Sequence, residues 1–140
     1  MSSESQKITA QVTIDVPVEK AWEIWSSPEH IVQWATASED WHTPKSENDL
    51  KPGGGFKNRM EAKDGSAGFD FTGTYDDVRE HEFISYTIAD GRKVEITFKE
   101  TDGKTELIEV FDAENEHPAD MQQQGWQAIL DNFKRHAEAA

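Results

Sequence analysis

The sequence of 140 residues contains no cysteine, which excludes disulfides, thiolate nucleophiles and cysteine-ligated metals. Basic residues are also scarce, because 14 lysines and arginines stand against 28 aspartates and glutamates, and the formal net charge is −14. An acidic surface repels phosphate backbones and anionic lipid headgroups alike. We therefore expect neither nucleic acid nor a membrane surface as a partner.

Long apolar segments are absent as well. No run of about eighteen apolar residues occurs, and residues 1–7 are too polar to form the hydrophobic region of a signal peptide. Together with the lack of cysteine, this favours a cytoplasmic location. A length of 140 residues is typical of one domain and sufficient to bury a core, so we expect residues 1–140 to form a single domain.

The order of the expected elements is strand, two helices, then several strands. Alternating apolar and polar residues predict a half-buried strand over residues 8–15. Apolar residues at helical spacing then predict two short helices, the first beginning at Val18 and the second at Pro28. Turns such as Asp64-Gly65 separate strand-length segments near 40–46, 54–63, 68–77, 82–89, 92–100 and 104–112. Consecutive strands joined by tight turns predict an antiparallel meander.

The last part of the chain, residues 118–138, predicts one long amphipathic helix. At about 1.5 Å per residue it would span roughly 31 Å, which is enough to cover a sheet. Apolar residues recur at helical spacing on one face, and we expect four of them to lie against the sheet: Trp126, Ile129, Leu130 and Phe133. The opposite face should remain largely exposed at Gln123, Gln127 and Lys134.

Strand alternation also indicates which side chains share the inner face of the sheet. Phe56, Asn58 and Met60 alternate with charged residues, so they belong to one face and the charged residues to the outside. In segment 104–112 apolar residues fall on both sides. The alternation therefore leaves open whether Glu109 points inward.

A family resemblance is carried by four segments, which are VPVEKAWEIWSSPEHIVQW at 16–34, LKPGGGFKNRMEAKDG at 50–65, FTGTYDDV at 71–78 and GWQAILDNF at 125–133. Their order and spacing resemble the START-like (SRPBCC) superfamily, specifically the branch named for activators of heat-shock protein ATPase. The resemblance covers nearly the whole chain. It implies an α+β helix-grip fold, in which a curved antiparallel sheet wraps around the long C-terminal helix. It further implies two short helices after the first strand and an apolar cavity between helix and sheet.

Small-molecule sites are typically apolar clefts with a few placed polar groups, and the inner face of this sheet has that character. We interpret it as a binding site for a small hydrophobic or aromatic ligand. Gly73 and Gly125 should leave gaps between bulky neighbours. The alternative is that the same side chains fill a dry core. The candidate ligand-binding residues are Trp41, Phe56, Asn58, Met60, Phe71, Gly73, Tyr75, Tyr86, Ile96, Phe98, Trp126, Ile129, Leu130 and Phe133.

Two other functions follow from the resemblance. The wider superfamily includes polyketide cyclases, and in a cyclase or dehydrase-like enzyme the acids and bases would be His42, Tyr75, Tyr86 and Glu109. Asp40 shares a strand face with His42 and could orient it. The sequence offers no nucleophile motif or oxyanion hole, so binding is favoured over catalysis. The second alternative, a chaperone-interacting stress protein, comes from the branch name alone.

Metal or cofactor binding is not expected. The five histidines include no pair at i, i+4 and no H-x-H motif, which are the spacings typical of metal ligands.

Overall fold

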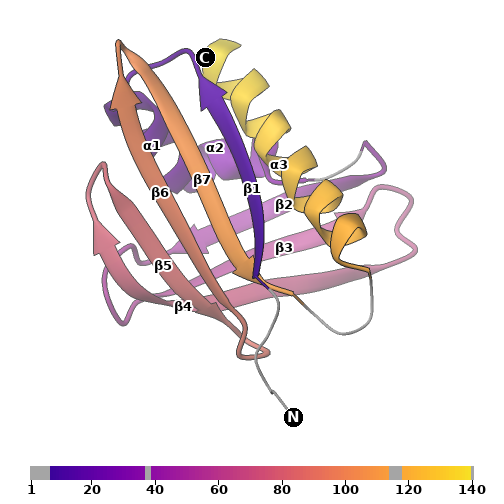
Figure 1. Ribbon diagram of the computed structural model, residues 1–140. Coiled ribbons are helices and arrows are strands. Elements are labelled where there is room, and N and C mark those ends of the chain that lie inside the picture. The colour runs from indigo at the N-terminus through magenta and orange to yellow at the C-terminus, as the bar shows by residue number, and fades with distance from the viewer. Residues whose placement is uncertain (1–6, 37–38, 114–117, 140) are drawn as a thin grey trace.

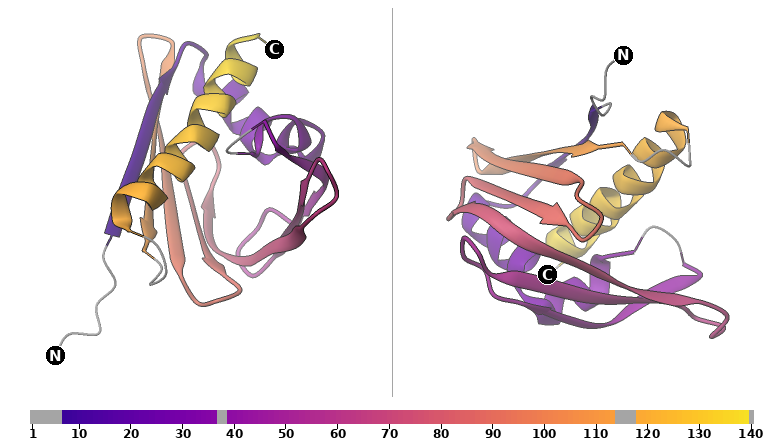
Figure 2. Two further views of the ribbon diagram at one scale, coloured as in Figure 1. Left: turned by 90° about the vertical axis from the view of Figure 1, so that its right-hand side faces the viewer. Right: turned by 90° about the horizontal axis from the view of Figure 1, so that it is seen from below.

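The computed structural model describes residues 7–36, 39–113 and 118–139. Two groups of residues named above lie outside these ranges. They are residues 1–6, which we judged too polar for a signal peptide, and His117, one of the five histidines. A curled antiparallel sheet of seven strands grips the C-terminal helix (Figures 1 and 2). The elements in chain order are β1 (Lys7–Ile14), α1 (Val18–Ser26), α2 (Pro28–Trp34), β2 (Trp41–Asn48), β3 (Gly55–Ala62), β4 (Gly68–Arg79), β5 (Phe83–Ile88), β6 (Lys93–Thr101), β7 (Lys104–Asp112) and α3 (Ala119–Ala139).

The expected α+β helix-grip architecture is confirmed, with two short helices after the first strand. The glycines of the tight turns explain why the strand ends were predictable. Gly65, Gly91 and Gly103 all adopt positive φ angles, a backbone conformation that glycine adopts at no steric cost. Each of these residues reverses the chain between two neighbouring strands.

The strand order is β1-β7-β6-β5-β4-β3-β2, so β2 to β7 form the predicted meander and β1 joins its far side. The pairing of β1 with β7 runs from Lys7↔Asp112 to Ile14↔Thr105. The helices α1 and α2 connect β1 to β2 across the open side of the curled sheet (Figure 2). The first and second strands of the chain are therefore the two edges of the sheet.

The core is densely packed around the C-terminal half of α3. Leu130, Phe133 and Ala137 are fully buried there. The ring of Phe133 meets Trp25 of α1 at 5.0 Å and Trp34 of α2 at 4.9 Å between centroids, both edge-on. The dry-core alternative is thus correct for this end of the molecule. The expectation that Trp126, Ile129, Leu130 and Phe133 lie against the sheet side is also confirmed, since none of them is exposed.

The expected exposure of Gln123, Gln127 and Lys134 is wrong, because all three side chains are half-buried. The reason is that α3 lies along the free edge of β1. The Gln127 side chain accepts a hydrogen bond from the Gln11 backbone N–H at 3.2 Å and donates one to the Gln11 carbonyl at 2.8 Å. Lys134 likewise donates to the carbonyl of Thr13 at 2.9 Å. Polar side chains of the helix thereby satisfy backbone groups that an edge strand leaves unpaired.

Candidate functional site

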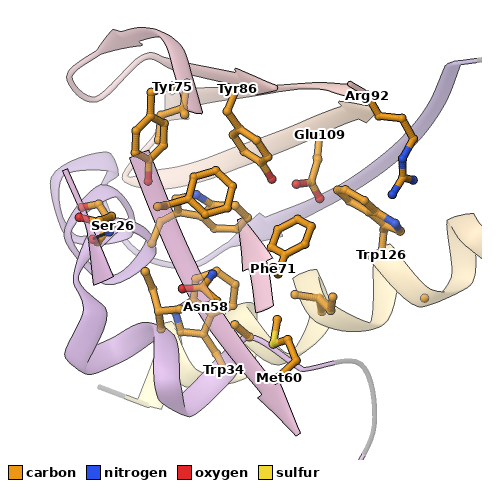
Figure 3. Close-up of a pocket in the computed structure, with 18 of the residues that line it drawn as sticks. Ser26, Trp34, Asn58, Met60, Phe71, Tyr75, Tyr86, Arg92, Glu109 and Trp126 are labelled. Carbon is orange, nitrogen blue, oxygen red and sulfur yellow. Dashed lines mark hydrogen bonds between the residues drawn. The ribbon is translucent and has the colours of Figure 1, made fainter. Parts of the chain in front are cut away.

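A cavity of about 630 Å³ lies between the concave face of the sheet and the N-terminal half of α3 (Figure 3). The helices α1 and α2 close a further side of it. The lining residues are Trp25, Ser26, Ile31, Trp34, Ala35, Asn48, Leu50, Phe56, Asn58, Met60, Phe69, Phe71, Tyr75, Ile84, Tyr86, Arg92, Glu109, Met121, Gln122, Gly125, Trp126 and Ile129. Apolar and aromatic side chains predominate in this set, and the few polar ones are spread among them.

Eight of the fourteen candidate residues from the sequence line this cavity, and these are Phe56, Asn58, Met60, Phe71, Tyr75, Tyr86, Trp126 and Ile129. They come from β3, β4, β5 and α3, which the curl of the sheet brings together. Met60 and Asn58 point in from β3, whereas Tyr75 and Tyr86 point in from the facing part of the sheet (Figure 3). Strand alternation identified the six strand residues because it assigned them to one face, and helical spacing identified Trp126 and Ile129.

The other six candidates do not line the cavity. Ile96, Leu130 and Phe133 are fully buried in the packed core. Phe98 is buried as well, with its ring 5.2 Å from that of Trp22 between centroids. Trp41 lies at the β2 edge with its ring 6.0 Å from that of Phe69.

The expected gap at Gly73 is wrong, because the ring of Phe56 occupies that space. A Cβ atom built on Gly73 would lie 2.6 Å from Phe56 Cε2 and 2.8 Å from the carbonyl oxygen of Thr87. The expected gap at Gly125 is present. A Cβ there would meet nothing within 4 Å, and Gly125 lines the cavity from the middle of α3.

Glu109 on β7 points into the cavity (Figure 3) and is only 4% exposed. Its register partners are apolar, namely Ala10 of β1 and Ile96 of β6. Burial raises the pKa of the Glu109 carboxyl to about 8, because ionisation in an apolar site loses the solvation of the charge. At pH 7 the carboxyl is therefore mainly neutral and can donate a hydrogen bond. Sequence alternation missed this orientation because Ile108 and Val110, on the outer face, are also apolar.

Tyr75 and Tyr86 are register partners on β4 and β5, with ring centroids 6.3 Å apart and planes nearly perpendicular. Burial raises the pKa of Tyr75 to about 12. Burial also raises the pKa of Tyr86, with smaller contributions from Glu109 and Tyr75. Both phenols therefore keep their protons at neutral pH. Together with Glu109 they place three O–H groups along one side of the cavity (Figure 3).

The other polar groups of the lining already have partners in the protein. The Asn58 side-chain oxygen accepts a hydrogen bond from Ser46 at 2.6 Å, and the Asn48 amide donates to the carbonyl of Ser26 at 2.7 Å. Arg92 donates to Asp90 at 2.8 Å. These contacts hold the walls of the cavity in place.

Large apolar side chains mark where the cavity meets solvent. Phe69 of β4 and Met121 of α3 both line it and are 50% and 55% exposed.

His42 stands apart from this site. It lies on β2 with its side chain 45% exposed, and its Nε2 atom is 3.9 Å from a carboxylate oxygen of Glu61. His42 does not line the cavity, so the structure does not bring it together with Glu109 or Tyr86. Within the described residues, no group of three or more histidine, aspartate or glutamate side chains is arranged to hold a metal ion.

Sequence reasoning missed several lining residues, including Trp25 and Trp34 of the two short helices. Their helical spacing was recognised, but it predicts only that they face the protein interior. That α1 and α2 also close the cavity depends on how they cross the open side of the sheet. Arg92 follows the turn at Gly91 and gave no signal in the sequence.

A curled antiparallel sheet that grips a long C-terminal helix over a cavity defines a START-like helix-grip domain. Residues 15–138 match the family model described as Activator of Hsp90 ATPase homolog 1-like protein, and the chain belongs to this family. No curated protein matches the chain. No helix within the described ranges is both long and apolar enough to span a membrane.

Solved structures agree with the assignment. An AHSA1-like protein from Aeromonas hydrophila is 48% identical with a TM-score of 0.90, covering 96% of this chain and 93% of that one. A protein from Cytophaga hutchinsonii is 50% identical with a TM-score of 0.83, covering 95% and 92%. A protein from Chromobacterium violaceum is 22% identical with a TM-score of 0.84, covering 94% and 96%, and this likeness shows the fold alone.

Proposed function

We propose that this protein binds a small hydrophobic or aromatic molecule in the cavity between α3 and the sheet. The observation that carries the proposal is the cavity itself, whose volume of about 630 Å³ falls in the range typical of small-molecule sites. The lining supports the same interpretation, since apolar side chains surround a small number of polar groups. A dry core would instead have closed this space by packing.

The aromatic character of the lining favours a ligand with flat rings. Trp25, Trp34, Phe56, Phe71 and Trp126 present ring edges or faces to the cavity from five different elements. Aromatic pairs gain from offset stacking and edge-to-face contacts in addition to the burial of apolar area. A planar ligand can make such contacts with several of these rings at once.

The polar groups of the cavity support binding more than catalysis. Within the described residues, no hydrogen bond joins Glu109 to Tyr75 or Tyr86, and no serine or threonine nucleophile lies beside a base in the lining. An active site of the cyclase type would need acids and bases within mutual reach. The chaperone alternative is supported by the family name alone.

A ligand screen by NMR tests the proposal. We would titrate ¹⁵N-labelled protein with a set of flat aromatic compounds and with aliphatic compounds of similar volume. The expected result is that aromatic compounds shift the amides of residues 121–129 together with those of β3, β4 and β5. Shifts confined to the outer face, for example at Lys57 and Lys99, would contradict the proposal, as would a screen in which no compound binds.

A further inference from the structure

Glu109 differs from the two buried threonines in having no hydrogen-bond partner among the described residues. Thr43 donates to the carbonyl of Ala35 at 2.9 Å, and Thr105 donates to the carbonyl of Val16 at 2.8 Å. Among the residues that the structure describes, none is hydrogen-bonded to the Glu109 carboxyl. No fully buried side-chain oxygen of the described residues lacks a partner, so the Glu109 carboxyl oxygens are open to the cavity and are not sealed in the core. Because this carboxyl points into the cavity, a bound molecule can supply the missing partner.

The groups that face Glu109 explain its ionisation state. Tyr86 of β5 and Tyr75 of β4 are the titratable groups on its side of the cavity, and both stay neutral. From β1, β6 and α3 it is faced by Ala10, Ile96 and Trp126, none of which titrates.

The one cation of the lining, within the described residues, is Arg92, which is paired with Asp90. Burial alone accounts for the raised pKa of Glu109, and no neighbouring positive charge lowers it. The carboxyl consequently carries a proton at pH 7 and is available to donate a hydrogen bond to a bound molecule.

The O–H groups of Glu109 and Tyr86 determine which functional group of a ligand can bind to them. A protonated carboxyl and a phenol each offer one O–H, and a carbonyl oxygen has two lone pairs that accept two hydrogen bonds. A neutral carboxylic acid beside a tyrosine is a known arrangement for holding a ketone oxygen in an apolar site. The side chains of Glu109 and Tyr86 both enter from the sheet on the same side of the cavity (Figure 3).

We propose that the ligand is an aromatic carbonyl compound, whose carbonyl oxygen accepts hydrogen bonds from Glu109 and Tyr86 while its rings occupy the apolar part of the cavity. This inference rests on the proposed function and names the ligand class of the same site. Tyr75 lies beside Tyr86 and provides a further donor near the carbonyl. A hydrocarbon of the same shape would leave these donors unpaired, which lowers affinity.

A matched pair of compounds tests the inference. Fluorenone and fluorene have the same fused rings and differ by a carbonyl in place of a methylene group. We would measure the dissociation constants of both by equilibrium dialysis at pH 6. The expected result is that fluorenone binds about tenfold or more tightly than fluorene. Equal affinities would overturn the inference and leave the proposed function standing, whereas failure of both compounds to bind would overturn the proposed function.

Two variants assign the preference to Glu109. Glu109→Leu should bind both compounds with similar affinity, because the donor is lost and the apolar cavity remains. Glu109→Gln should keep the preference for fluorenone, since its amide N–H donates in place of the carboxyl O–H. A fluorenone preference that persists in Glu109→Leu would overturn the inference. Tyr86→Phe should reduce the preference without abolishing it.

The pH dependence gives a second, independent readout. A carboxylate cannot donate, so the affinity of the unmodified protein for fluorenone should be constant below about pH 8 and fall at higher pH, by up to about tenfold per pH unit. The affinity of Glu109→Gln for fluorenone should not change over this range. A pH profile that is the same in both proteins would contradict the role of Glu109.

Discussion

The indole of Trp126 lies flat against the ring of Phe111, with ring centroids 3.9 Å apart and planes inclined by 10°. This stack joins α3 to β7, two residues from Glu109 along the same inward face of the strand. Trp126 therefore lines the cavity only with the surface that Phe111 leaves free. The contact fixes the position of the helix wall relative to the polar groups of the site.

Replacement of Trp126 by Phe tests its contact with the ligand. The phenyl ring can still pack on Phe111, so we expect the variant to fold. Of the five tryptophans in the chain, Trp25, Trp34 and Trp126 line the cavity. The change in tryptophan emission on adding an aromatic ligand should be smaller in Trp126→Phe than in the unmodified protein.

Trp41→Phe is the matched control, because Trp41 lies at the β2 edge outside the cavity lining. Its ligand-induced emission change should equal that of the unmodified protein. An unchanged response in Trp126→Phe would mean that the ligand does not reach this part of α3.

Filling the gap at Gly125 should block binding. A leucine there would project into the open space of the cavity without meeting protein atoms near its Cβ. Glycine inside a helix is less stable than alanine by about 1 kcal/mol, so Gly125→Leu should fold at least as stably as the parent. We expect the dissociation constant for an aromatic ligand to rise at least about tenfold, as measured by equilibrium dialysis.

Gly125→Ala controls for the change in helix propensity, and it should gain stability while retaining most of the affinity. Gly73→Ala provides a contrast, because its methyl group would overlap the ring of Phe56. That variant should lose about 1–3 kcal/mol of stability through overpacking. Unimpaired binding by Gly125→Leu would place the ligand elsewhere.

The buried carboxyl of Glu109 should make stability depend on pH. Its pKa of about 8 in the folded protein lies above the ordinary value of 4.5. Folding therefore favours the protonated form of the carboxyl. The contribution of this preference to the stability of the folded protein is complete below pH 4.5 and is lost as pH rises through about 8. Relative to the unmodified protein, Glu109→Gln should gain roughly 1–3 kcal/mol in the free energy of unfolding between pH 5 and pH 8.

Urea denaturation of both proteins at pH 5, 6.5 and 8 measures this difference. A difference in the free energy of unfolding that is constant over the three values would show that Glu109 titrates normally and is solvated.

The contacts of α3 with the edge strand β1 should contribute to the stability and the solubility of the protein. Gln127→Ala removes both hydrogen bonds to the backbone of Gln11, and we expect a loss of about 1 kcal/mol because these bonds are partly exposed. The uncovered backbone groups should also favour association through the edge strand. Chemical denaturation and size-exclusion chromatography measure the two effects.

Gln124→Ala is the control for this variant, since Gln124 is exposed on the same helix. It should be as stable as the parent. Equal stability of the Gln127 and Gln124 variants would contradict a structural role for the contact with β1.

The sequence was most informative where local chemistry decides the structure. Turn glycines and strand alternation predicted the ends of the strands, and helical spacing predicted α3, because these signals depend on neighbours in the chain. Gln127 was misjudged because its partner Gln11 lies more than one hundred positions away. Nothing in a helical pattern indicates that its polar face will meet an edge strand.

The site was predictable to the extent that it follows from the inner face of the sheet. Strand alternation selected Phe56, Met60 and Tyr86 correctly as cavity-lining residues. It could not separate the cavity from the packed core, so Ile96 was chosen with them. The difference depends on where α3, α1 and α2 contact the sheet, and this is a property of the assembled fold.

The most direct test of ligand binding in the cavity is a measurement of intermolecular NOEs between bound fluorenone and the side-chain methyl groups of the protein. Binding in the cavity predicts NOEs from the ring protons to Met60 of β3 and Ile129 of α3, which both line the cavity. The methyl groups of Ile108 and Val110, on the outer face of β7, should show none. NOEs to Ile108 and Val110 without any to Met60 or Ile129 would contradict the account.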